Sequence, residues 1–163
     1  AYLVFERLGH PDFTLDNPAQ NEKDVPLAPY YLVWDNRRSP ELVAEGAVFW
    51  PYQVDQVLVS SARKEALLPP GLAPGFDAAV AATQLHCLSC HQVNGYGGEK
   101  WPGNLAEQAR ALSPAEFVRW VVEPGSVRPD TTMPGLPAAM ALAERERLAR
   151  EIHRYLLALP LQP

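Results

Sequence analysis

Apolar residues recur at helical spacing in the second half of the chain. Between residues 76 and 90 they fall three or four positions apart, which places them on one face of a predicted helix. These residues are Phe76, Val80, Thr83, Cys87 and Cys90. A second apolar face predicts a last helix from about Leu142 to Leu159, which Pro160 ends. This half of the chain is therefore expected to be mainly α.

A third helix is expected between these two. Ser113 fits the N-cap, Pro114 the first helical position and Glu116 the third, which together form a typical helix start. Glu123 precedes Pro124, and the residue before a proline resists the α region, so the helix should end there. Its apolar face consists of Phe117, Trp120 and Val121.

The first half gives weaker patterns. Residues 9–29 combine Gly and Pro with Asp and Asn, a composition typical of loops. The run Tyr30–Trp34 is rich in aromatic and β-branched residues and predicts a strand, and Gln53–Ser60 fits a strand loosely. A short helix is expected over residues 39–43, with Ser39 as its N-cap. We expect a small two-stranded element among loops, too small to be stable alone.

Composition adds a boundary. The chain has 163 residues and 17 prolines, about twice the usual ~5%. The Pro- and Gly-rich segment Leu67–Gly75 is typical of a stiff connector. It predicts a loop-rich N-terminal extension with a small β element, residues 1–73, and a second domain, residues 74–163.

The net charge of −5 lies mostly in the first part. Residues 1–73 hold 6 basic and 10 acidic residues, and residues 74–163 hold 8 and 9. This balance disfavours nucleic-acid binding, because contacts to phosphates need a basic face. No apolar run approaches the ~20 residues of a membrane-spanning helix.

The segment Cys87-Leu88-Ser89-Cys90-His91 has the spacing of a c-type haem attachment motif. Two thiols about one helical turn apart can each form a thioether with one vinyl group of the same porphyrin. The histidine that follows can then reach the iron from one face. Because these are the only two cysteines in the chain, haem attachment would use both.

Three other interpretations of the motif are weaker. A redox dithiol is expected in a βαβ unit, and no strand is predicted before this motif. Zinc needs four ligands, usually from two separated pairs, whereas His86, Cys87, Cys90 and His91 are packed into six residues. A structural disulfide would leave His91 without a role.

A haem iron held by one histidine needs a second ligand or stays open to small molecules. Methionine as that ligand gives an electron-transfer iron with a raised potential. Met133 is favoured because it lies in the proline-bearing loop 131–135, although a methionine there can also merely fill a gap. Met140 is expected to pack near the start of the last helix. His10, His86 and His153 are weaker candidates, and His153 is expected to be a surface or packing residue.

Residues 75–160 resemble a class I single-haem c-type cytochrome. The resemblance rests on the attachment motif, the loop 95–98, the turn 101–105, Trp120 in a middle helix, Met133-Pro134 and a terminal helix with Tyr155. It implies a helical haem domain with one covalently attached haem c and His91 and Met133 as iron ligands. It also implies that the Pro102 carbonyl accepts a hydrogen bond from the outer nitrogen of His91.

The resemblance also assigns the surroundings of the haem. The expected apolar wall consists of Leu105, Phe117, Trp120, Val121 and Leu136, each of which can equally be ordinary core. Tyr96, Trp101 and Arg128 are candidate partners of a haem propionate. Ala79 and Thr83 stand where the family usually carries a glycine and an aromatic residue at the crossing of its first and last helices.

These residues predict an electron-transfer protein rather than an enzyme, in a compartment outside the cytoplasm such as a bacterial periplasm. Segments 30–34 and 46–54 are similar to parts of cytochrome subunits that accompany periplasmic molybdopterin oxidoreductases of the sulfite-oxidising type. That similarity implies a redox protein partner, such as an oxidoreductase of this type, on which residues 1–73 would dock. The alternative is a haem protein with an open iron for gas binding, sensing or peroxide chemistry.

Overall fold

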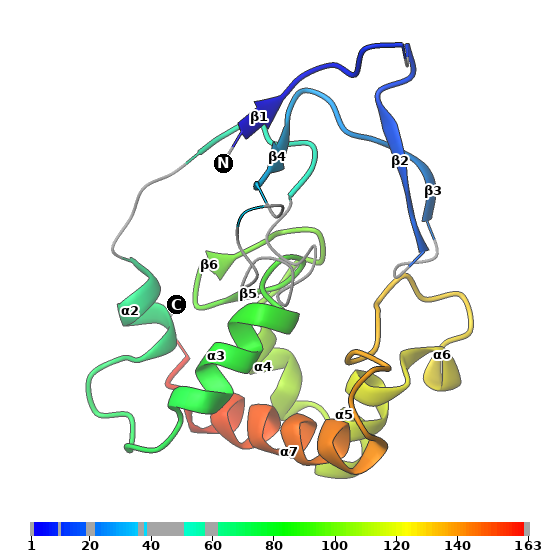
Figure 1. Cartoon of the computed structure of the whole chain (residues 1–163). Helices are drawn as coiled ribbons and strands as arrows, with labels where there is room; N and C mark the ends of the chain where they lie inside the picture. Colours follow the sequence, from blue (N-terminus) through cyan, green and yellow to red (C-terminus); the bar gives the residue numbers. More distant parts are fainter. Residues whose placement is uncertain are drawn as a thin grey trace. The chain divides into compact units, whose positions relative to one another are not determined.

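A computed structural model describes residues 2–9, 11–18, 22–35, 38, 51–57 and 62–161. The chain divides into two compact units, Ala1–Val59 and Ser60–Pro163 (Figure 1). The division falls earlier than the boundary near residue 73 that the connector predicts. Each unit is described by itself below.

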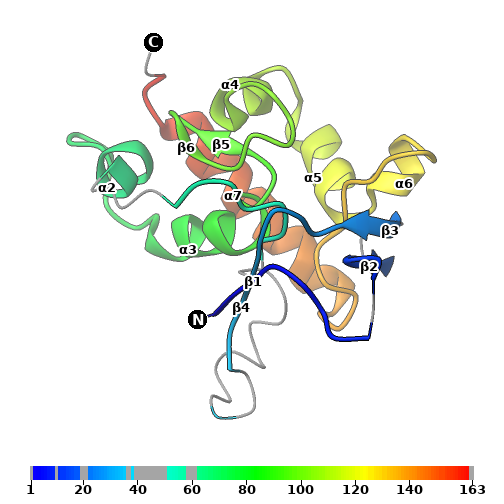
Figure 2. The same cartoon turned by 90° about the horizontal axis from the view of Figure 1, so that it is seen from above.

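The first unit contains two antiparallel ribbons. Strand β1 (Tyr2–Val4) pairs with β4 (Tyr31–Val33), and β2 (Thr14–Asn17) pairs with β3 (Glu22–Pro26) (Figures 1 and 2). The strand predicted at Tyr30–Trp34 is therefore confirmed as β4.

Strands β2 and β3 lie within residues 9–29, where a loop was predicted, so that prediction is wrong. The hairpin contains residues that usually form loops, and its strand pairing and backbone angles are irregular where they occur. Its register shifts between Leu15 and Asn17. Asp24 has φ of 49°, and its N–H donates to the Asp16 carboxylate at 3.0 Å. Asp and Asn tolerate such backbone better than other residues, which explains their presence here.

The strand predicted over Gln53–Ser60 is absent from its described part, residues 53–57. Gln53 has φ of 59°, which turns the backbone out of the extended region. Residues 58–60 and the short helix predicted over 39–43 lie outside the described residues.

The second unit is built around its last helix. In the described part of the chain, its elements are α2 (Ala62–Leu67), α3 (Asp77–His86), β5 (Gln92–Val93), β6 (Tyr96–Gly97), α4 (Leu105–Arg110), α5 (Pro114–Val122), α6 (Pro124–Val127) and α7 (Leu142–Ala158). Helices α3, α4 and α5 all contact α7 (Figure 1). The second unit is therefore built mainly of helices. Because the described chain also contains small sheets, its fold class is mixed rather than the predicted mainly α.

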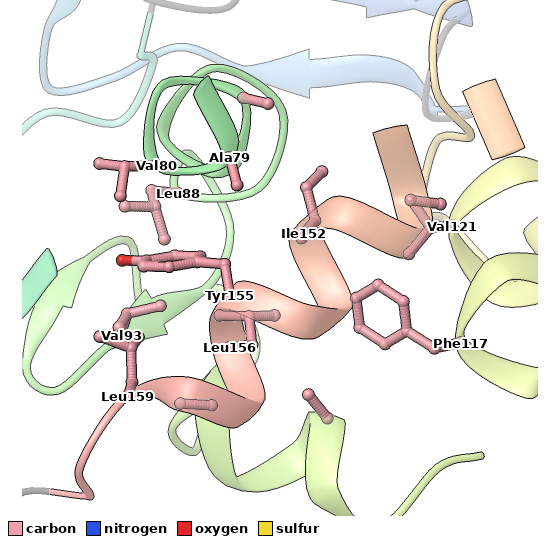
Figure 3. Packing of buried hydrophobic residues seen from close by; sticks show 14 of the residues in the cluster. Ala79, Val80, Leu88, Val93, Phe117, Val121, Ile152, Tyr155, Leu156 and Leu159 are labelled. Carbon is pink, nitrogen blue, oxygen red and sulfur yellow. The ribbon is translucent and has the colours of Figure 1, made fainter. Parts of the chain in front are cut away.

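The last helix supplies the centre of the core. Ile152, Tyr155 and Leu156 on α7 are fully buried. Figure 3 shows them between Ala79 and Val80 of α3 on one side and Phe117 and Val121 of α5 on the other. The helix predicted from about Leu142 to Leu159 is confirmed, and its apolar face packs in the core.

The crossing of α3 and α7 is made by small and aromatic residues together. Ala79 and Thr83 are buried on α3, and the Thr83 hydroxyl donates to the Ala79 carbonyl at 2.7 Å. Phe76 and Tyr155 have ring centroids 5.8 Å apart. Because Thr83 satisfies its own hydroxyl within α3, it can be buried at the crossing.

Tyr155 also explains where the second unit begins. Its hydroxyl donates to the Leu67 carbonyl at 2.7 Å. Leu67 ends α2 and is 1% exposed within the same core. Leu67, the first residue of the Pro/Gly connector, is thereby joined to α7, so the connector is an internal loop of the second unit rather than its border.

The start of α5 is the predicted capping box. Ser113 Oγ accepts from the Glu116 N–H at 3.3 Å, and the Glu116 carboxylate accepts from the Ser113 N–H at 2.8 Å. These hydrogen bonds favour the charged carboxylate and hold the pKa of Glu116 below its ordinary 4.5.

Glu116→Ala should therefore destabilise the protein in a pH-dependent way. A carboxyl group with a lowered pKa in the folded state stabilises the fold above its unfolded pKa, and this contribution is lost as the pH falls through the folded pKa. We expect the variant to unfold at lower urea than the native protein at pH 7. The gap should close as the pH is lowered below 4.5. An equal gap at pH 7 and pH 3 would contradict the role given to the carboxylate.

Candidate functional site: the Cys87–His91 turn

The attachment motif forms a tight turn at the end of α3. The helix ends at His86, earlier than the predicted Cys90, and Cys87 caps it by donating its N–H to Thr83 at 2.9 Å. The Cys87 carbonyl then accepts from the N–H groups of Cys90, at 3.2 Å, and His91, at 3.0 Å. Both thiols and the imidazole are thus placed on one turn of backbone.

The loop that follows holds this turn in place through backbone hydrogen bonds. The Gly98 N–H donates to the carbonyls of Leu88 at 2.9 Å and His91 at 3.0 Å, and the Trp101 N–H donates to Cys90 at 3.1 Å. A Cβ at Gly98 would overlap the Ser89 carbonyl. From the sequence, this glycine loop was expected at the site only because of the resemblance. The structure shows that its missing side chains allow backbone to pack on backbone.

His91 carries an unsatisfied buried group. Its Nδ1 is buried and has no hydrogen-bond partner among the described residues. Burial also lowers the pKa of His91, so the neutral imidazole is favoured. A buried polar atom without a partner is rare, and Nδ1 is the nitrogen that was expected to donate to the Pro102 carbonyl.

The Cys87 thiol does not resemble the nucleophile of a reactive dithiol. Burial, and then the neighbouring Cys90, raise the pKa of the Cys87 thiol to about 12. Redox-active cysteines have a lowered pKa because the thiolate is the nucleophile. No disulfide joins Cys87 and Cys90. In the part of the chain that the structure describes, no group of three or more His, Cys, Asp or Glu side chains is placed to hold a metal ion.

The predicted second ligand, Met133, lies in the loop between α6 and α7. Its side chain is half-buried and packs against the hydrophobic core. Its N–H donates to Thr131 Oγ1 at 3.1 Å, which fixes the backbone there. Met140, the other methionine, is half-buried in the turn before α7, where its N–H donates to Pro137 at 2.9 Å.

The other candidate histidines differ from one another. His153 is 3% exposed, stacks on Phe117 at 4.6 Å, and has Nε2 3.1 Å from the Ala109 carbonyl oxygen. It is a packing residue, one of the two roles predicted for it. His86 is half-buried, and burial lowers its pKa. His10 lies outside the described residues.

The predicted haem surroundings divide into two groups. Those packed in or against the core are Tyr96, Leu105, Phe117, Val121 and Leu136, and Cys87 shares this cluster with them. Those outside the cluster are Trp101 and Arg128, which are exposed, and Trp120, which is half-buried. Arg128 lies 3.9 Å from Asp130 in an exposed ion pair.

Pro102 does not make the hydrogen bond that was predicted. Its carbonyl accepts from Gln108 Nε2 at 2.9 Å, and His91 Nδ1 has no partner among the described residues. Gln108 is on α4, six residues after Pro102, and is the donor that reaches this carbonyl. The sequence carries no sign of this hydrogen bond.

Two polar groups that the sequence analysis missed hold the site in place. Asn104 caps α4 and accepts from the Asn94 N–H, while its Nδ2 donates to Asn94 Oδ1 at 2.7 Å. Arg110 donates to the carbonyls of Leu156 at 3.2 Å and Leu157 at 3.1 Å at the end of α7. An asparagine before a helical segment is a recognisable N-cap signal, but nothing near Arg110 indicates its role.

Comparison with protein-family models, curated proteins and solved structures finds no match to this chain. Among the described residues, no helix is long and apolar enough to cross a membrane.

Proposed function

We propose that this chain is a single-haem c-type cytochrome that transfers electrons, with the class I haem-domain fold in its second unit. The observation that carries the proposal is the turn at the end of α3. It presents two thiols and a neutral imidazole on one turn of backbone. A haem iron with histidine and methionine ligands supplies one-electron chemistry at a raised potential.

The residues have separate tasks in this proposal. Cys87 and Cys90 would hold the macrocycle covalently, and His91 and Met133 would be the iron ligands. Leu105, Leu136 and Trp120 would cover the haem with apolar groups, and Tyr96 and Trp101 would bind its propionates. Burial of the apolar residues limits access of water, which is one of the means by which proteins set a haem potential.

The electrons would come from a redox protein partner and pass to a further acceptor. A molybdopterin oxidoreductase is one such partner, with this chain as its electron-transfer subunit rather than as an enzyme itself. Because covalent haem attachment takes place outside the cytoplasm, we place the protein in the bacterial periplasm or an equivalent compartment.

Met133→Ala tests the proposed ligand set, with Met140→Ala as the matched control. The oxidised native protein should show the weak red absorption band of a methionine-ligated haem, and the reduced protein should not bind carbon monoxide. Met133→Ala should lose the band and bind carbon monoxide, whereas Met140→Ala should behave as the native protein.

The alternative is a haem protein with an open iron. It requires that the native protein lacks the band and binds carbon monoxide readily. That result would overturn the electron-transfer proposal. Loss of the band in Met140→Ala alone would move the ligand to the other methionine.

A further inference from the structure

The ribbon of β1 and β4 has one covered edge and one open edge. On the far side of β4, the Leu32 N–H donates to Pro51 at 3.0 Å and the Tyr30 carbonyl accepts from the Val54 N–H at 2.9 Å. Strand β1 pairs only with β4 in the described sheets (Figure 1). Among the described residues, the open edge of the ribbon therefore belongs to β1, and not to the strand predicted at Tyr30–Trp34.

The register identifies which backbone groups point outward. Leu3 lies opposite Leu32 in the antiparallel pairing. Because the backbone of Leu32 is directed away from β1, toward Pro51, the two residues form a non-hydrogen-bonded pair. The N–H and carbonyl of Leu3 are thus directed away from β4, where they meet no partner among the described residues.

The side chains near this edge are apolar and exposed. Tyr2 is 61% exposed, Leu3 49%, Phe5 64% and Leu8 100%. Proteins usually protect an edge strand with charges or proline, and residues 2–5 contain neither. An unprotected apolar edge is the structure to which an extended peptide adds as a further strand.

Charge indicates the kind of partner. The first unit, residues 1–59, has 4 basic and 9 acidic residues, a net charge of 4 − 9 = −5. The second unit, residues 60–163, has 10 of each and a net charge of 0. The whole net charge of the chain therefore lies on the unit that carries the open edge. Two copies paired through β1 would repel each other, whereas a basic partner would be attracted.

We propose that the open edge of β1 binds an extended apolar segment of a partner protein, flanked by lysine or arginine, as an added β-strand. The backbone groups of Leu3 would form the central hydrogen bonds. The inference does not depend on haem, because every residue that carries it lies in the first unit.

The test measures binding of a labelled peptide, Lys-Lys-Thr-Val-Tyr-Val-Thr-Lys-Lys, to the full-length protein by fluorescence anisotropy. Leu3→Pro removes an N–H that the β1–β4 pairing does not use, and Leu3→Thr is the matched control that keeps it. We expect Leu3→Pro to weaken binding about tenfold or more and Leu3→Thr to change it much less. The same peptide with glutamate in place of lysine should not bind measurably.

A second arm does not depend on the fold of the variant. N-methylation of alternate peptide residues removes the donors on one edge of the probe and should abolish binding to the native protein. Equal binding of the N-methylated peptide, equal binding to folded Leu3→Pro, or absence of binding by the native protein would overturn the proposal. So would concentration-dependent dimerisation that Leu3→Pro abolishes, because it would identify a second copy as the occupant.

Discussion

Gly97→Ala is expected to destabilise the protein more than the same change at either neighbouring loop glycine. Gly97 has φ of 129°, and a Cβ there would overlap the His91 carbonyl oxygen. A Cβ at Gly98 would overlap the Ser89 carbonyl, but the φ of Gly98 does not lie in the positive region. Gly95 has φ of 80° and open space around it. The three positions thus separate backbone strain from steric overlap.

We expect Gly97→Ala to lower the free energy of unfolding by about 3–5 kcal/mol, the sum of strain and overlap. Gly98→Ala should cost about 1–3 kcal/mol for overlap alone, and Gly95→Ala about 1–2 kcal/mol for strain alone. Urea unfolding of the three full-length variants measures this order. An effect at Gly97 no larger than at Gly95 would show that the loop does not clamp the attachment turn.

Tyr155→Ala is expected to have the second large effect. The side chain is fully buried, packs near Phe76 and donates its hydroxyl to Leu67. Removing a buried aromatic ring costs about 3–5 kcal/mol. Tyr155→Phe keeps the ring but leaves the Leu67 carbonyl without its donor, which should cost about 1–3 kcal/mol.

The comparison of Tyr155→Ala with Tyr155→Phe also tests whether the second unit begins near residue 60, before α2. If Tyr155 holds α2 against α7, Tyr155→Phe should increase amide hydrogen exchange in residues 62–67 more than in α5. Equal changes in both helices, or a wild-type stability for Tyr155→Phe, would contradict the hydrogen bond as the link between α2 and the core.

The helices that the sequence predicts well are those with complete local signals. Helix α5 has its capping box at Ser113 and Glu116, and α7 has an uninterrupted apolar stripe, so neighbouring residues alone determine their type. The hairpin of β2 and β3 is missed because Asp24 supports an irregular strand with residues that usually indicate loops. The start of the second unit depends on a contact between Leu67 and Tyr155, 88 residues apart, which no local pattern reveals.

The candidate site likewise has features that the local sequence predicts and features that depend on tertiary contacts. The Cys87–His91 motif is contiguous, so its spacing alone predicts its chemistry. The hydrogen bond expected from His91 to the Pro102 carbonyl is not found, and that carbonyl accepts from Gln108. Which side chain reaches a given carbonyl depends on the path of the loop between them. The identity of the second ligand, Met133, likewise depends on tertiary structure and stays a prediction.

The most direct test of the central claim is the mass of the intact protein after expression in a bacterial periplasm together with a haem-attachment system. We predict the mass of the polypeptide plus one haem, with the haem resisting extraction by acidified acetone. Cys87→Ser with Cys90→Ser should abolish this attachment. A native protein that has the mass of the bare polypeptide, or that releases its haem to the solvent, would contradict the account.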